Sequence, residues 1–175
     1  MPKSFLCLYD SGNVKTKEFK PRKYGAGGKE LYEFWDFGPE PARHCSYSYH
    51  MCYGPYPLST ESSEPGMAVA SDLNPWMDAP GENARDFSVF DPNGDRATQM
   101  AGNAIVHENA GQNVLFMDNH VYFEKQSTCG VDQDNIYTYW NGSDIRQGAP
   151  PVMGSQPADR LDSLLVNDPP LNNSK

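Results

Sequence analysis

The sequence predicts a β-rich α+β fold in which an antiparallel sheet carries long loops and little helix. Three observations support this prediction. The 175 residues include 15 glycines and 15 prolines, which interrupt helices and favour turns. Hydrophobic residues make up 38% of the chain, below the globular norm, while aromatic residues reach 12% and each bury a large area. The third observation is a hairpin pattern at residues 113–125.

The hairpin is expected to consist of strands at 113–118 and 120–125, joined by a turn at Asp118-Asn119. Asp and Asn tolerate the positive φ angles that a two-residue hairpin turn requires. Because side chains alternate between the two faces of a strand, this turn predicts one wholly apolar face with Phe116 and Phe123 buried. The side chains on that face are Val114, Phe116, Val121 and Phe123.

A longer signature surrounds the hairpin. It consists of His107, Asn113-Val-Leu-Phe, Asp118 with His120-Val-Tyr-Phe, and Asp134-Asn-Ile-Tyr-Thr. This pattern resembles the C-terminal signature of the prepilin-like H-X9-DG proteins, relatives of the type II secretion pseudopilins. Shorter segments at 5–10, 46–54, 70–76 and 162–166 match the family pattern in the same order.

The chain departs from the family pattern at three points. Ten residues, instead of nine, separate His107 from Asp118, and Asn119 stands where the family has glycine. We also expect no counterpart of the family's N-terminal membrane helix in this sequence. The resemblance implies a pseudopilin-head-like domain at residues 1–166, and we expect 167–175 to be a flexible tail.

The same resemblance implies a function. It predicts a non-catalytic, exported structural or adhesive subunit, located in the periplasm or outside the cell. Its implied partners are other pilin-like subunits or surface polysaccharide. The net charge of −9 argues against nucleic acid as a partner, because phosphate binding needs clustered Lys and Arg. No apolar run reaches 18 residues, so no membrane segment is expected in this chain.

Export also implies an oxidising compartment, which favours disulfides. On that basis we expect Cys7 to be bridged to Cys129, since Cys45 and Cys52 would point to opposite faces of a regular strand. Four buried thiols are the alternative. The cysteines form no Cys-x-x-Cys pair, which argues against a structural zinc site.

Calcium is a candidate cofactor, and the segment that predicts it runs from Asp91 through Asn93 to Asp95. Oxygen side chains at alternate positions of a tight loop are typical of the start of a calcium site. An EF-hand would continue with Gly and Glu where Arg96 and Gly102 stand, so this is not an EF-hand. A plain β-turn without a cation explains the same residues.

His107, Asp118 and His120 form a second candidate site. Two imidazoles and a carboxylate are suitable ligands for zinc or another transition metal. The hairpin turn alone also explains Asp118. Asp72 ends a short apolar segment, where it either caps the local backbone or faces a ligand.

These four residues are the catalytic candidates of an alternative function, a carbohydrate-active or metal-dependent hydrolase. Its substrate-binding candidates are the aromatic side chains Trp35, Tyr47, Tyr49 and Trp76. A cleft lined by these rings and by two facing carboxylates would favour the hydrolase. Buried rings and scattered carboxylates would favour the structural subunit.

Overall fold

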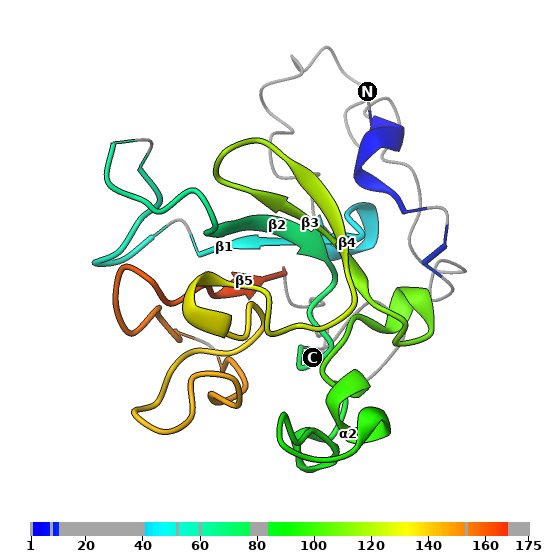
Figure 1. Cartoon of the computed structure of the whole chain (residues 1–175). Coiled ribbons are helices and arrows are strands. Elements are labelled where there is room, and N and C mark those ends of the chain that lie inside the picture. The colour runs from blue at the N-terminus through cyan, green and yellow to red at the C-terminus, as the bar shows by residue number, and fades with distance from the viewer. Residues whose placement is uncertain are drawn as a thin grey trace, which may run out of the picture.

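The computed structural model describes residues 2–7, 9–10, 41–51, 53–59, 61–77, 84–152 and 154–167. Its centre is a five-stranded antiparallel sheet with the strand order β4-β3-β2-β1-β5 (Figure 1). The strands are β1 (Tyr47–His50), β2 (Ala68–Asp72), β3 (Gln112–Phe116), β4 (Val121–Glu124) and β5 (Leu165–Val166). The β-rich α+β fold with long loops and little helix is therefore confirmed.

Helical structure is short and lies outside the sheet. The α-helix α2 (Arg96–Met100) lies apart from the strands, below them in Figure 1. The remaining helical segments of the described residues are 3-10 turns, namely η1 (Pro2–Phe5), η4 (Pro41–His44), η5 (Phe87–Val89), η6 (Ile105–His107) and η7 (Val131–Gln133). Within this described part of the chain, no helix is long and apolar enough to cross a membrane.

The central strand β2 separates a core face of the sheet from a polar face. Ser71 lies opposite Val114 of β3, and directly opposite residues share a face, so both point toward the core. The next residue, Asp72, points to the other face because side chains alternate. The core cluster on the first face consists of Ala68, Trp76, Phe90, Ala104, Val106, Val114, Phe116, Ile136, Tyr137 and Leu165.

The expected hairpin forms, but its register differs by one residue from the prediction. Leu115, instead of Phe116, lies opposite Val121. The chain reverses through a three-residue loop that ends at Asn119, whose φ is 70°. This is the common hairpin loop in which a turn is followed by a left-handed residue.

A one-residue slip moves every side chain of a strand to the opposite face. Phe116 is buried as expected, at 4% exposure, whereas Phe123 is 40% exposed. The predicted burial of Phe123 is therefore wrong, and so is the common apolar face with Val121. Both β4 side chains instead share the polar face of the sheet with Leu115.

The expected disulfide between Cys7 and Cys129 is also wrong, because Cys129 carries a free thiol. The physical reason is that the sheet lies between the two residues. Cys129 packs against the core cluster on one face. Cys7 lies near Asp72, on the other face.

The hairpin register can be tested with two phenylalanine variants. Phe116→Ala is expected to lower the free energy of unfolding by about 3–5 kcal/mol, because it removes a buried ring. Phe123→Ala is expected to lower it by about 1 kcal/mol, since this ring is partly in solvent. Urea denaturation measures both values. Equal losses in the two variants would contradict the observed register and support the two-residue turn.

Candidate functional site

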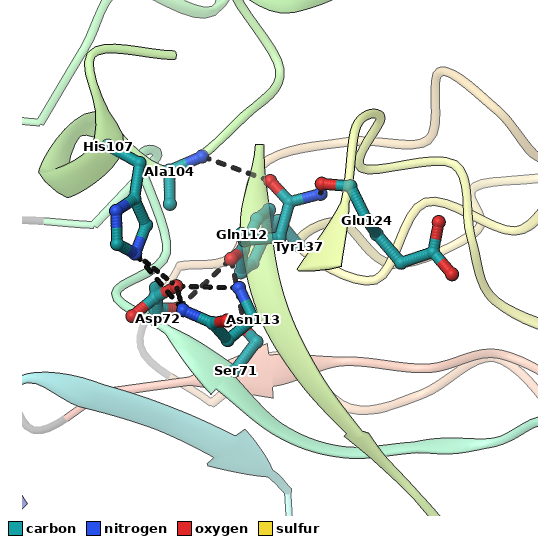
Figure 2. Close-up of polar contacts among 8 residues, drawn as sticks. All are labelled: Ser71, Asp72, Ala104, His107, Gln112, Asn113, Glu124 and Tyr137. Atoms are coloured by element: carbon teal, nitrogen blue, oxygen red, sulfur yellow. Dashed lines mark hydrogen bonds and ion pairs between the residues drawn. The ribbon is translucent and has the colours of Figure 1, made fainter. Parts of the chain in front are cut away.

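The candidate site is built around Asp72, the last residue of β2. Its side chain is completely buried although it lies on the polar face of the sheet. Asp72 Oδ2 accepts a hydrogen bond from the main-chain N–H of Asn113 at 2.7 Å. The same oxygen lies 3.0 Å from Nε2 of His107, and Figure 2 shows the imidazole pointing at the carboxylate from η6.

Local backbone geometry places His107 over the end of β2. The 3-10 turn η6 ends at His107, and the next two residues, Glu108 and Asn109, have φ angles of 55° and 64°. These left-handed residues reverse the chain so that β3 begins at Gln112. The reversal brings the His107 ring back above Asn113, the second residue of β3.

Aromatic rings flank the imidazole on the polar face. The Phe123 ring meets His107 edge-on at a centroid distance of 5.5 Å, and the Tyr9 ring lies at 5.9 Å. The His107 side chain is 15% exposed, whereas the Asp72 side chain is fully buried. The imidazole therefore lies between the Asp72 carboxylate and the solvent. The shift in hairpin register creates part of this arrangement, because it moves Phe123 onto this face.

Asn113 contacts both members of the pair. Its side-chain amide nitrogen lies 3.2 Å from Asp72 Oδ2 and 3.2 Å from His107 Nε2. Figure 2 shows this amide beside the carboxylate and within reach of the imidazole. Through these contacts and the main-chain bond, Asn113 fixes the position of Asp72 relative to β3.

Cys7 is the third ionisable residue of the site. Its sulfur, a carboxylate oxygen of Asp72 and an imidazole nitrogen of His107 all lie within 4.8 Å of one another. Burial raises the pKa of the Cys7 thiol, while hydrogen bonds from the main chain of Tyr9 and Asp10 lower it. The sequence alone does not connect Cys7 with Asp72 or His107, because no local spacing relates the three residues.

Opposing effects also act on the Asp72 carboxyl group. Burial raises its pKa, and the hydrogen bonds from Asn113 and the proximity of His107 lower it in part. One carboxylate oxygen, Oδ1, is buried without a hydrogen-bond partner. A buried carboxylate with an unsatisfied oxygen is costly, so this group is expected to hold a proton or a cation.

The metal site expected from His107, Asp118 and His120 does not form as a group. His120 and Asp118 pair with each other at the hairpin turn, where both side chains are about half exposed. The main-chain N–H of His120 also donates to this carboxylate, and this bond is the main reason that the pKa of Asp118 is lowered. Among the described residues, the group that could hold a metal is Cys7, Asp72 and His107.

The predicted calcium loop uses its oxygen atoms in contacts within the protein. Asp91 Oδ1 accepts from the main chain of Asn93, and Asp95 caps α2 by accepting from the main chain of Thr98. The side-chain oxygen of Asn93 accepts from the Arg146 guanidinium at 2.7 Å. The turn and cap interpretation therefore accounts for all three side chains, and calcium binding stays a prediction.

The predicted aromatic residues do not form one platform. Trp76 is buried in the core against Phe87 and Phe90, at centroid distances of 4.9 and 5.7 Å. Tyr47 is half-buried opposite Asp72, and Tyr49 is exposed farther along β1. Trp35 lies outside the described residues. Two surface grooves lie beside α2, and none of the predicted site residues lines either of them.

Asp134 and Asp162 are two buried acidic residues. Burial and repulsion by Asp162 raise the pKa of Asp134 well above its usual value. Asp134 Oδ2 accepts from the main chain of Ser163 at 2.7 Å. The Asp162 carboxylate accepts from the main chain of Trp140 and Ala158. Main-chain partners of this kind indicate a structural role for the pair.

No protein-family model matches the chain. No curated protein matches it in sequence, and no solved structure matches it in fold. The function must therefore be inferred from the geometry of the chain itself.

The raised pKa of Asp134 predicts an unusual pH dependence of stability. Because the folded state binds this proton more tightly than the unfolded state, the free energy of unfolding should rise as pH falls through the folded-state pKa of Asp134. Denaturation over a series of pH values above the usual titration range of a carboxyl group measures this slope. Asp134→Asn should flatten it, while Asp132→Asn, at an exposed carboxylate on η7, should keep it. An unchanged slope in Asp134→Asn would contradict the prediction.

Proposed function

We propose that the chain is a pseudopilin-like, non-catalytic subunit, exported to the periplasm or the cell exterior, that assembles with pilin-like subunits through the free edge of its sheet. The observation that carries this proposal is the composition of β4. Three consecutive apolar residues of this edge strand are exposed: Val121 by 64%, Tyr122 by 62% and Phe123 by 40%.

The main chain of β4 also supports assembly at this edge. Phe116 donates a main-chain hydrogen bond to His120, so these two residues form a hydrogen-bonded pair. Bonded and non-bonded pairs alternate along an antiparallel ladder. The main-chain N–H and C=O groups of Val121 and Phe123 therefore point away from β3, toward an edge with which no other strand of the described residues pairs.

Proteins usually protect such an edge with charged side chains, proline or a bulge. Strand β4 has none of these before Glu124, its last residue. An extended segment of another subunit can add to an edge of this kind, since main-chain hydrogen bonds supply affinity and alternate side chains supply specificity. The exposed apolar residues then become part of an interface.

The residues of the family signature are accounted for by folding. Asp118 and Asn119 form the hairpin loop, and Phe116 enters the core. His107 holds the end of β2 through Asp72. A signature made of residues that position one hairpin is the pattern expected of a structural subunit.

The assembly proposal predicts that a charge on β4 prevents self-association. Val121→Lys should shift the purified chain toward the monomer, because a lysine at the free edge opposes strand addition. Val152→Lys is the matched control, since Val152 is 69% exposed and lies outside the sheet. Sedimentation velocity over a range of concentrations measures both variants. A wild-type chain that stays monomeric throughout, or equal effects in both variants, would contradict the proposal.

A metal-dependent or carbohydrate-active hydrolase is the second candidate function. The observation that favours it is the buried Asp72 beside the partly exposed His107, since a carboxylate and an imidazole can exchange protons with a substrate. Tyr47 and Tyr49 lie on the same side of the sheet and could contact a sugar.

A panel of polysaccharides and model glycosides, with and without EDTA, tests this function. Turnover that His107→Gln abolishes would favour the hydrolase.

A further inference from the structure

Three different ligand types meet on the polar face of the sheet. The sulfur of Cys7, a carboxylate oxygen of Asp72 and an imidazole nitrogen of His107 lie within 4.8 Å of one another. Ligand atoms around a tetrahedral zinc ion, with bonds of about 2.0–2.3 Å, lie roughly 3.3–3.8 Å apart. Small side-chain movements would therefore bring all three atoms to bonding distance of one ion.

The unsatisfied oxygen of Asp72 points to a missing positive partner. Asp72 Oδ1 is buried and accepts no hydrogen bond, whereas Oδ2 contacts both Asn113 and His107. Buried charges in proteins are normally paired or coordinate metals. A cation at this carboxylate would supply the partner that the protein does not.

Asn113 fixes the Asp72 carboxylate beside the imidazole. Its main-chain N–H and its side-chain amide both donate to Asp72 Oδ2, at 2.7 and 3.2 Å. His107 Nε2 lies 3.0 Å from the same oxygen, close enough to share a proton with it. A cation bound by both groups would take the place of that proton.

Neighbouring groups hold the candidate ligands in place. The main-chain N–H of Asp10 donates to the carbonyl oxygen of Cys7 at 3.2 Å. Asn113 contacts both Asp72 and His107. Groups that orient ligands in this way are typical of metal sites.

We propose that Cys7, Asp72 and His107 bind one zinc ion, which clips the N-terminal segment to the polar face of the sheet. Sulfur, nitrogen and oxygen ligands together suit zinc, whereas calcium and magnesium require oxygen ligands. The ligands come from the segment after η1, from β2 and from η6, so the ion connects parts of the chain that are distant in sequence.

Zinc binding is independent of the proposed assembly and can be tested separately. The full chain is treated with a chelator and titrated with Zn²⁺ in competition with a chromophoric chelator. One ion per chain is expected, and zinc should raise the Tm because it binds the folded state. Cobalt(II) should give the charge-transfer absorption of a cobalt–thiolate bond. Val121→Lys should bind zinc like the wild type, even if the assembly proposal fails.

Matched variants identify the ligands. Cys7→Ser and His107→Gln should each lower zinc affinity by about tenfold or more, and Cys7→Ser should also abolish the cobalt–thiolate absorption. The controls are Cys129→Ala, a free thiol on the core side, and His120→Gln, an imidazole that pairs with a carboxylate at the hairpin turn. Both controls should bind zinc like the wild type.

Two results would overturn the proposal. One is the absence of stoichiometric zinc binding to the wild type, and the other is a loss of affinity in the controls equal to that in the site variants. If Cys7→Ser does not fold, as judged by circular dichroism, Asn113→Ala replaces it. That change leaves every ligand in place and should lower zinc affinity by about 10–100-fold, so unchanged affinity would also contradict the site.

Discussion

The hydrogen bonds of Asn74 hold the structure together at the point where β2 ends. The side-chain amide donates to the carbonyl oxygens of Tyr137 and Leu165, at 2.8 and 2.7 Å. The main-chain N–H of Asn74 donates to Ser48 Oγ at 2.7 Å, and its side-chain oxygen accepts from the main chain of Trp76. One buried residue thus connects β1, β5, the Tyr137 segment and the entry of Trp76 into the core.

This constraint explains how a chain with few strands and many loops keeps a defined core. Loops carry polar main-chain groups, and each of these needs a partner when it is buried. Side chains such as Asn74 and Ser48 supply those partners where the sheet ladder ends. Tyr137 does the same on the core face, where its hydroxyl group donates to the carbonyl oxygen of Asp72 and accepts from Ser71 Oγ. The apolar cluster can therefore pack against irregular segments without leaving main-chain groups unsatisfied.

Asp72 is held in place by the same network but points in the opposite direction. Its carbonyl oxygen lies on the core face of the sheet, where it accepts from Tyr137. Its side chain lies on the polar face with His107 and Cys7. The candidate site and the free edge of β4 are in contact there, because the Phe123 ring packs edge-on against the His107 ring. A subunit that adds to β4 would therefore lie beside the site.

Local patterns in the sequence were sufficient to predict the β-rich class, the hairpin and the burial of Phe116. These features depend on residue alternation and on the tolerance of Asp and Asn for turn conformations, which act over a few residues. The hairpin register could not be predicted, because Asp118-Asn119 fits both a two-residue and a three-residue loop. Val114 and Phe116 enter the core in either case, and the three-residue loop that forms moves Phe123 to the polar face.

The candidate site was predictable only in part. Asp72 and His107 stand out by residue type, but sequence analysis placed His107 with Asp118 and His120, and the absence of a Cys-x-x-Cys pair argued against zinc. The tertiary structure instead brings Cys7 to Asp72 and His107 from three separate segments. No local spacing in the sequence indicates that these three side chains lie together. Their proximity depends on which strands pair and on the reversal of the chain after η6. Sequence by itself therefore determined the kinds of element present, and long-range packing decided which side chains face one another.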